Sequence, residues 1–555
     1  MFTSLPPQFV ESPVTGGVPF GSTFAIAPDG KLFVVEQPGR IQVYSNYTSG
    51  TLLESNFFRD AQPAVNFSGE RGMFGIAFDP DYATNHYVYV HYTKDAFPFP
   101  NRVTRFTANP AGDLALPSSE TLLLEMEPSP NSNHNGGGMH FGPDGKLYVG
   151  VGDNAVGANA QSLTTLKGKI LRMNVTPGDI IPSDNPTSFD GIAGTTSGIH
   201  RLIWAAGLRN PYTFAFQPGT GRMYINDVGE TSWEEINEGA PGRNYGWPAT
   251  EGDFDPKSFP NFTRPVLAYP HVGEPFAGRA IVGAAFYNPA VNMFPPDYAG
   301  DYFFADFMAG WIRRIDPITK QVSDFASELP FVADLRVAPD GSLLYLTYDE
   351  TPGHVFRVTF DDVAPIVTSS AFQFDGFTLP DAPHRLRFAF SEDVSESLAT
   401  DDLVLRNTTT NQLVDAKDLA LTYDAATNTA TFTVPGFVDG VLPDGRYSAT
   451  VPASSVTDRA GNALAADAGA DFFFLRGDAN HDARVNLTDF NTLAGNFGQS
   501  KRIFSQGDFN YDGMVNLADF NLLASRFGAV IAPASASSGP WVTRDRRDTL
   551  DDLLG

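Results

Sequence analysis

The stretch MHFGPDGKLYVGVG, residues 139–152, has the pattern of one antiparallel hairpin: an apolar strand, a Pro-Asp-Gly turn and a second apolar strand. Proline and glycine supply the turn dihedrals, and the flanking alternation of side chains is typical of half-buried strands. Strict or looser copies are FAIAPDGKLFVV (24–35), GIAFDPDYATNHYVYV (75–90), FAFQPGTGRMYIND (214–227), GAAFYNP…GDYFFAD (283–306) and LRVAPDGSLLYLTYD (335–349). Six copies at intervals of roughly 40–75 residues predict a mainly β protein with a six-bladed β-propeller over residues 1–362.

The composition fits several folded domains in a chain of 555 residues, of which 42% are hydrophobic and 18% charged. The net charge of -27, without a basic patch that would neutralise phosphates, argues against a nucleic-acid partner. It is compatible with calcium, which prefers oxygen ligands. The lack of cysteine excludes disulfides and thiolate chemistry, and no apolar run is long enough to predict a membrane span.

The first residues, MFTSLPPQFVESP, lack the basic segment and apolar stretch of a signal peptide. Two interpretations stay open at this point: a cytosolic protein, or a secreted one whose sequence here begins after its signal. The domains further along the chain favour the second, so we expect an extracellular protein.

Residues 363–475 have a different character. Apolar alternation appears in HRLRFAFSE (384–392), NTATFTVPGF (428–437) and GRYSATVP (445–452), and Asp, Asn and Gly turns separate these stretches. The blade hairpin motif does not recur. This spacing predicts an immunoglobulin-like β-sandwich. It carries no catalytic constellation, and we interpret it as a spacer or binding module.

A duplicated segment follows, GDANHDARVNLTDFNTLAGNFG (477–498) and GDFNYDGMVNLADFNLLASRFG (507–528). Each copy fits a 12-residue calcium loop, with side-chain oxygens at positions 1, 3, 5, 9 and 12 and a backbone carbonyl at position 7. The predicted ligands are Asp478, Asn480, Asp482, Arg484 (carbonyl), Asn486 and Asp489 in the first loop, and Asp508, Asn510, Asp512, Met514 (carbonyl), Asn516 and Asp519 in the second.

Position 6 of such a loop needs a sharp turn, which Gly513 allows and Ala483 does not. A positive backbone angle at Ala483 would cost about 1 kcal/mol, so we expect the first site to bind more weakly. After each loop, apolar residues at i, i+3 and i+7 predict one helix face by which the two copies can pack. These residues are Phe490, Leu493 and Phe497, and Phe520, Leu523 and Phe527.

A strand-like ADFFFLRG (470–477) precedes the first loop where an EF-hand would have a helix. Loop-helix units duplicated within about 50 residues resemble a type I dockerin, here over residues 476–529, with a disordered small-residue tail over 530–555. The resemblance implies an extracellular module that folds on calcium and docks onto a cohesin-like partner. Loop positions 10 and 11, where dockerins commonly have a Ser-Thr pair, are Leu487-Thr488 and Leu517-Ala518.

Five segments of the propeller region carry a second resemblance. They are GERGMFGIAFDPDY (69–82), NHNGGGMHFGPDGKLYVGVGD (133–153), LKGKILRMN (166–174), GLRNPYTFAF (207–216) and EEINEGAPGRNYGWP (234–248). In this order they resemble the soluble quinoprotein glucose/sorbosone dehydrogenases, which are six-bladed propellers. The match extends over about residues 5–360.

The resemblance implies roles for individual residues. His134 would accept the proton of a sugar's anomeric hydroxyl while hydride passes to pyrroloquinoline quinone, and Asp153 would orient the imidazole. Arg209 and Asn210 would contact the quinone, as would Glu70, which stands where sugar-oxidising members often have glutamine. The backbone carbonyls of Gly229 and Glu230 would hold a calcium ion beside the cofactor.

Three cations of the family pattern are missing. Its cofactor-binding lysine aligns with Met308, and its two late arginines align with Phe331 and Ala333. Arg336 lies close in sequence, but strand alternation predicts that it faces away from the side of Ala333.

Two functions therefore compete. One is a secreted, calcium-dependent dehydrogenase that oxidises an aldose or related sugar with a quinone and is tethered through its dockerin. The other is a non-catalytic propeller that binds carbohydrate or protein in an extracellular assembly. No paired carboxylates stand out to support hydrolysis. The first function requires that the ring of sheets bring His134, Arg209 and Asn210 to one mouth.

Overall fold

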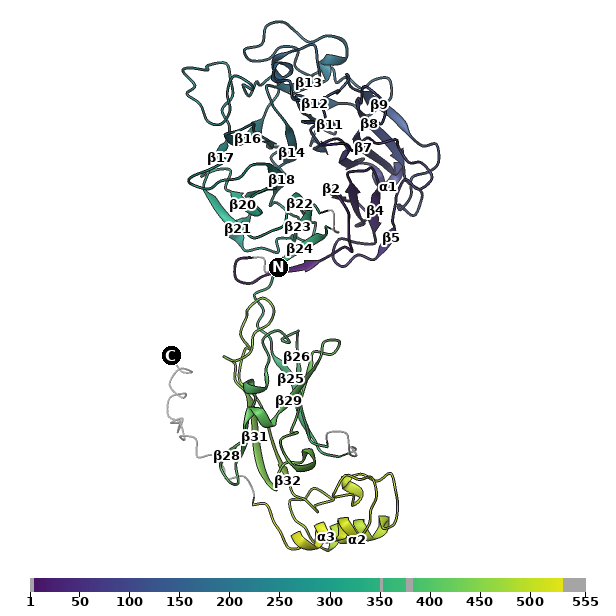
Figure 1. Cartoon of the computed structure of the whole chain (residues 1–555), viewed down its shortest axis with the longest axis vertical. Helices are drawn as coiled ribbons and strands as arrows, with labels where there is room; N and C mark the ends of the chain where they lie inside the picture. The colour runs from purple at the N-terminus through teal and green to yellow at the C-terminus, as the bar shows by residue number, and fades with distance from the viewer. Residues whose placement is uncertain (1–3, 350–352, 376–382, 533–555) are drawn as a thin grey trace, which may run out of the picture. The chain divides into compact units, whose positions relative to one another are not determined.

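The computed structural model describes residues 4–349, 353–375 and 383–532 (Figure 1). The chain divides into two compact units, Met1–Asp361 and Asp362–Gly555. Most of the predicted tail, from residue 533 on, lies outside the described residues. Within the described part, no helix is long and apolar enough to cross a membrane.

The first unit consists of six four-stranded antiparallel sheets (Figure 1). Named from the innermost strand outward, they are β2 (Gly21–Ile26), β3 (Leu32–Glu36), β4 (Ile41–Tyr44) and β5 (Leu52–Glu54); β6 (Met73–Phe78), β7 (Tyr87–Thr93), β8 (Asn101–Thr107) and β9 (Thr121–Glu125); β10 (Met139–Phe141), β11 (Leu147–Val151), β12 (Lys169–Met173) and β13 (Ile203–Ala206); β14 (Pro211–Phe216), β15 (Met223–Asp227), β16 (Trp233–Gly239) and β17 (Leu267–Pro270); β18 (Ile281–Phe286), β19 (Tyr302–Asp306), β20 (Trp311–Ile315) and β21 (Val322–Ala326); and β22 (Val332–Val337), β23 (Leu343–Thr347), β24 (Val355–Phe360) and β1 (Phe9–Pro13).

The sheets form a closed ring. Innermost strands contact their neighbours in the order β2, β6, β10, β14, β18 and β22, and β22 contacts β2 again. The N-terminal strand β1 completes the last sheet by pairing with β24, from Phe9 opposite Phe360 to Pro13 opposite Phe356. Each hairpin motif of the sequence forms the two inner strands of one sheet, so the predicted six-bladed propeller is confirmed.

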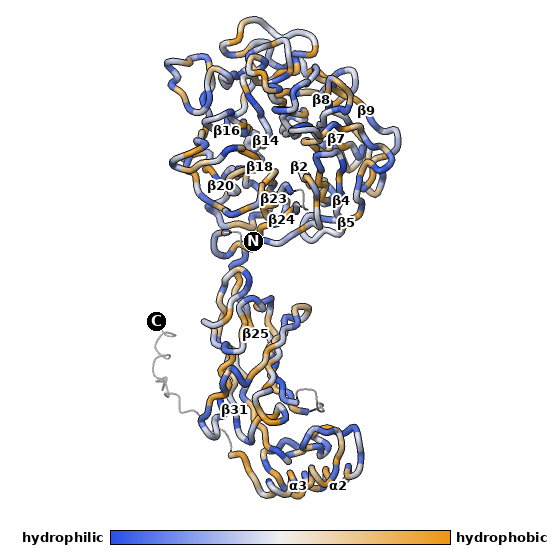
Figure 2. The backbone as a smooth tube through the Cα atoms, viewed as in Figure 1, coloured by the Kyte–Doolittle hydropathy of each residue, from blue (hydrophilic) through white to orange (hydrophobic). Residues whose placement is uncertain are grey.

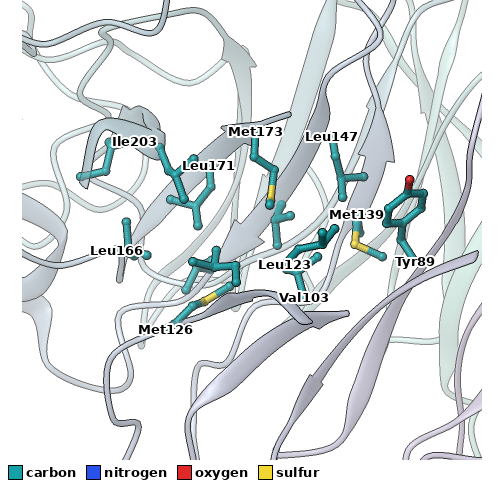
Figure 3. Close-up of a cluster of buried hydrophobic side chains, with 14 of the residues drawn as sticks. Tyr89, Val103, Leu123, Met126, Met139, Leu147, Leu166, Leu171, Met173 and Ile203 are labelled. Carbon is teal, nitrogen blue, oxygen red and sulfur yellow. The ribbon is translucent and has the colours of Figure 1, made fainter. Parts of the chain in front are cut away.

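The burial of the second strands differs from the prediction. Strands β3, β11, β15, β19 and β23 are buried at every residue instead of alternating. The reason is that both faces of a blade pack against the neighbouring blades. Figure 3 shows one such interface, where Tyr89 and Val103 of one sheet meet Met139, Leu147 and Leu171 of the next. Figure 2 shows hydrophobic segments along the strands of the sheets and a mixture of hydrophilic and hydrophobic residues in the loops.

The second unit begins with a sandwich of two four-stranded sheets, as predicted. One sheet has the order β25 (Val367–Gln373), β26 (Arg385–Phe390), β30 (Thr429–Thr433), β29 (Ala420–Asp424). The other has the order β28 (Gln412–Leu413), β27 (Val404–Asn407), β31 (Gly445–Val451), β32 (Ala468–Phe474). In β31 buried and half-buried residues alternate, which places one face on the core of the sandwich.

Helices are few. They are the single turn α1 (Tyr82–Asn85) in the propeller, and α2 (Leu487–Asn496) and α3 (Leu517–Arg526) after the sandwich. Short 3₁₀ turns cover Gly157–Gln161, Gly198–Leu202, Pro296–Tyr298, Thr400–Asp402, Ala416–Asp418, Val438–Gly440 and Phe504–Gln506.

Helices α2 and α3 follow the two predicted calcium loops. Asn486 and Asn516 are their N-caps, and each forms a capping box with the aspartate three residues on. Leu493 and Leu523 are buried, as a packed helix face requires.

The predicted apolar faces are wrong at their last residue. Phe497 and Phe527 are more than half exposed, because α2 and α3 end one residue earlier and the backbone turns extended there. Phe490 and Phe520 do meet, with ring centroids 6.3 Å apart.

The loop-helix region packs directly on the sandwich through aromatic residues at position 4 of each loop. Tyr511 is fully buried, and its hydroxyl donates a hydrogen bond to the carbonyl of Phe374 at 2.9 Å. The ring of His481 stacks on Phe374 and Phe473, at centroid distances of 4.5 and 4.0 Å. This region and the sandwich therefore share one hydrophobic core.

Candidate active site

A cavity of about 560 Å³ lies where the inner strands of all six sheets begin. Its wall includes five predicted residues: Glu70, His134, Arg209, Asn210 and Gly229. Its volume is in the range of small-molecule and cofactor sites, about 300–1,000 Å³. A second cavity, of about 860 Å³, lies at the opposite ends of these strands and contains none of those five.

His134 is held by a buried carboxylate. Its Nδ1 lies 2.7 Å from Oδ1 of Asp153, which is 1% exposed. The Nε1–H of Trp247 donates to Asp153 Oδ2 at 2.8 Å, and the backbone N–H of Ala155 donates to Oδ1 at 2.7 Å. Both oxygens of Asp153 act as hydrogen-bond acceptors, so the group that faces Oδ1 must donate. We therefore assign the proton of the neutral His134 imidazole to Nδ1. Nε2 is then left as the basic nitrogen of a cavity-lining side chain.

Glu70 fixes the backbone at the histidine. Its Oε2 accepts the N–H of His134 at 2.9 Å, and its Oε1 accepts from the side-chain amide of Asn133 at 3.1 Å. Both carboxylate oxygens are thus engaged by the histidine loop. The structure places Glu70 in the cavity, where its contacts hold His134 in place.

The glycines after His134 permit this close packing. Gly136 has φ +74°, and a Cβ there would lie 2.3 Å from the carbonyl oxygen of Gly150. Gly145 has a similar φ, +71°, but its Cβ would meet open space. A comparison of the two glycines therefore distinguishes the cost of a positive φ from the cost of steric overlap.

We expect Gly136→Ala to destabilise the propeller more than Gly145→Ala. Each substitution carries the cost of a positive φ, about 1 kcal/mol. Only the first adds overpacking against a backbone oxygen, roughly 1–3 kcal/mol. Thermal and denaturant unfolding of the two variants measure the difference, and equal losses would contradict the role given to Gly136.

Arg209 and Asn210 are positioned by Asp227. Its Oδ2 accepts the backbone N–H of Arg209 at 2.9 Å, and its Oδ1 accepts that of Asn210 at 2.6 Å. Burial raises the pKa of Asp227 to about 7. The Asn210 side-chain oxygen accepts the N–H of Gly136 at 3.0 Å, which ties the arginine segment to the histidine loop.

The guanidinium of Arg209 has two further contacts. Its Nη1 donates to the carbonyl of Val228 at 2.9 Å, and the group lies 5.6 Å from the centroid of the Trp247 ring. Trp247 therefore touches both Asp153 and Arg209. No local motif indicates this role of Trp247, because the residue is 94 positions from Asp153 along the chain.

The segment predicted to hold calcium is a tight turn. One oxygen of Glu251 accepts four consecutive backbone N–H groups, those of residues 230–233, at 2.8–3.3 Å. A Cβ at Gly229 would fall 1.6 Å from the carbonyl oxygen of Trp233, so only glycine fits there. Gly229 lines the cavity, whereas Glu230 lies outside the part of the cavity wall that the described residues form.

Aromatic residues lie near the positions at which this chain lacks the family's cations. Met308 and Phe331 are 57% and 46% exposed and lie outside the cavity wall, while Ala333 lines it. Phe307 and Tyr348 line it as well, with ring centroids 5.8 Å apart.

Arg336 lines the opposite cavity because it lies further along β22 than Ala333, and its Nη1 lies 2.6 Å from Asp334 Oδ1. Arg279, which no sequence motif marks, contributes a second guanidinium to the wall of the first cavity.

The fold and the site define a propeller protein with a ligand cavity at one mouth and a carboxylate-backed histidine in its wall. Residues 18–357 match the glucose/sorbosone dehydrogenase family, and the chain belongs to that family. Residues 361–474 match the bacterial Ig-like domain, which agrees with the observed sandwich.

Three relatives illustrate the similarity. The aldose sugar dehydrogenase YliI of Escherichia coli is 28% identical over 314 residues, which cover 54% of this chain and 79% of that protein. Quinoprotein glucose dehydrogenase B of Acinetobacter calcoaceticus is 28% identical over 258 residues, 42% of this chain and 51% of that protein. The crystal structure of a putative glucose dehydrogenase from Thermus thermophilus superposes with a TM-score of 0.52 at 26% identity, over 63% of this chain and 99% of that one.

The chain spans about half the length of other curated relatives that it matches. The match to the glucose/sorbosone dehydrogenase family covers the propeller part of the chain.

Proposed function

We propose that the propeller is a quinone-dependent dehydrogenase that oxidises an aldose or a related sugar. The observation that carries this proposal is the His134–Asp153 pair in the wall of a cavity that also contains Arg209. The names of two relatives, an aldose sugar dehydrogenase and a quinoprotein glucose dehydrogenase, support the substrate class and the cofactor class.

The cavity fits pyrroloquinoline quinone in its chemistry. This cofactor is a planar aromatic tricarboxylate, which calls for aromatic surfaces and cations. The rings of Tyr212, Phe307 and Tyr348 and the guanidinium groups of Arg209 and Arg279 line the cavity. Asn210 lines it too, and the carbonyls of Gly229 and Glu230 are the proposed calcium ligands. When bound, the quinone supplies the hydride acceptor.

The residues of the chain then have distinct tasks. Nε2 of His134 would accept the proton of the sugar's anomeric hydroxyl, and the bound quinone would supply the acceptor for the anomeric hydride, so that the product would be a lactone. Asp153 stabilises the imidazolium that forms, since it is buried and accepts from Nδ1. Trp247 and Ala155 fix Asp153 through hydrogen bonds, so the base is oriented before the sugar binds.

We also propose that the loop-helix region is a calcium-dependent dockerin of an extracellular protein, with a cohesin-like partner. The aspartates at loop positions 1 and 12 are fully buried in both loops. Burial raises the pKa of Asp478 and Asp508 to about 6, and a cation bound in the loop would favour their charged form. Leu487 and Leu517, at position 10, are 61% and 62% exposed and offer an apolar surface to a partner. Detection of the protein in the medium of its source cells would test the location.

A second candidate function is a propeller that binds carbohydrate or protein without turnover. The observation that favours it is the loss of the three family cations at Met308, Phe331 and Ala333. Each charge-assisted hydrogen bond contributes about 1.5–3 kcal/mol, so their absence weakens quinone binding unless other groups replace them.

One titration distinguishes the two functions. The purified full-length protein with calcium is titrated with pyrroloquinoline quinone, followed by tryptophan fluorescence, and dye-linked oxidation of aldoses is then assayed. We expect saturable binding, sugar-dependent dye reduction, and weaker binding by Arg209→Ala. Absence of binding at millimolar quinone, or quinone binding without sugar-dependent dye reduction, would favour the non-catalytic function, whereas tight binding that survives Arg209→Ala would exclude only the role of Arg209.

A further inference from the structure

The fourth and fifth sheets of the propeller are built alike at the cavity mouth. Arg209 stands two residues before β14, and Arg279 stands two residues before β18. The first residue of each inner strand pairs with an aspartate that ends the second strand, Asp227 in one sheet and Asp306 in the other. The two arginines therefore occupy equivalent positions in neighbouring blades.

The residue after each arginine makes an equivalent backbone hydrogen bond. Asp227 accepts the backbone N–H of Asn210 at 2.6 Å, and Asp306 accepts that of Ala280 at 3.1 Å. The next residue, Ile281, donates its N–H to the buried carboxylate of Glu234 at 3.1 Å. The backbone beside Arg279 is thus fixed by two carboxylates, as the backbone of Arg209 is fixed by Asp227.

The guanidinium groups differ in their partners. That of Arg209 donates to the carbonyl of Val228, whereas that of Arg279 has no hydrogen bond or ion pair with any residue in the described ranges. Carboxylates pair with several buried or half-buried arginines of this chain, such as Arg172, Arg314 and Arg357. Arg279, in contrast, is exposed at the cavity mouth. An arginine without a partner in a cavity wall is available to an anionic ligand.

We propose that Arg279 is a second anion-binding arginine of this cavity and that it binds a carboxylate of the ligand. The inference rests on the proposed function and extends it, because this arginine supplies a cation at a mouth where three family cations are missing. The carboxylate can belong to the quinone or to an acidic sugar such as a uronic acid. In both cases guanidinium matches carboxylate geometry with two parallel hydrogen bonds.

The test compares Arg279→Gln and Arg279→Lys with Arg243→Gln. Arg243 is a matched control, since its side chain is 52% exposed, pairs with Asp190 and lies outside the cavity wall. Each full-length variant is titrated with pyrroloquinoline quinone and with the trimethyl ester of the quinone in the presence of calcium. Glucuronate and glucose are titrated separately by calorimetry without quinone. This arm tests whether Arg279 binds the carboxylate of a sugar even if the protein binds no quinone.

We expect Arg279→Gln to raise the Kd of the quinone roughly 10- to 100-fold, Arg279→Lys to raise it less, and Arg243→Gln to leave it unchanged. The ester, which lacks carboxylates, should bind all four proteins alike. A loss of affinity confined to glucuronate, with glucose unaffected, would assign the carboxylate to the sugar and also support the proposal.

Other results overturn it. If the wild type binds quinone and Arg279→Gln binds both quinone and glucuronate equally well, Arg279 has no such role while the proposed function stands. If the wild type binds no quinone, the proposed function fails, and glucuronate binding alone decides the role of Arg279. If the wild type binds neither ligand, both proposals fall.

Discussion

Dye-linked sugar oxidation is expected to fall by two to four orders of magnitude in His134→Ala, because general-base catalysis contributes about 10²- to 10⁴-fold. The substitution removes the nitrogen that accepts the hydroxyl proton and leaves the rest of the cavity wall in place. Initial rates at saturating quinone and sugar measure the loss. Quinone affinity, measured in parallel, should change far less than turnover.

Asp153→Asn is expected to cause a loss of similar size for a different reason. An amide at this position can donate to Nδ1 of His134, which moves the imidazole proton to Nε2 and removes the base. His200→Ala is a suitable control, since His200 pairs with Glu127 at 3.0 Å and lies outside the cavity wall. Turnover within a few-fold of wild type in either His134→Ala or Asp153→Asn would exclude the proposed base.

The sequence was sufficient to predict the local strands and turns of the fold, but not how these elements pack against one another. Period-2 alternation around Pro-Asp-Gly turns identified the inner hairpins, since both signals are local. It misjudged strands such as β11 (Leu147–Val151), buried on both faces, because the second face is covered by a neighbouring blade. The same limit applies to Phe497, whose exposure follows from where α2 ends.

The site shows the same division. His134, Arg209 and Asn210 were found through short motifs, and the structure brings them to one cavity. Arg279 was missed because Ala-Gly-Arg-Ala-Ile, residues 277–281, lacks the Asn-Pro that marks Arg209, although both arginines precede an inner strand by the same two residues. Trp247 reaches Asp153 through tertiary packing alone.

Removal of calcium is expected to unfold α2 and α3 and to free Tyr511 from the sandwich. In each loop, the carboxylates at positions 1 and 12 are buried within one short segment, and without a cation their repulsion opposes folding. At a calcium concentration of 1,000 times Kd, binding stabilises a site by about 4 kcal/mol. Because Tyr511 is fully buried against Phe374 and His384, the loss should reach the edge of the sandwich. The strands of the propeller unit should remain.

Circular dichroism after chelation measures the helical loss, and the near-ultraviolet tyrosine signal reports the release of Tyr511. Two reciprocal variants link these changes to the loops. Ala483 has φ +65° and Gly513 has φ +78° at the same loop position, so Ala483→Gly should strengthen the first site and Gly513→Ala should weaken the second. Each change corresponds to about 1 kcal/mol, or roughly fivefold in calcium affinity. A helical signal that survives chelation, or equal calcium affinities in both variants and the wild type, would mean that these loops are not calcium sites.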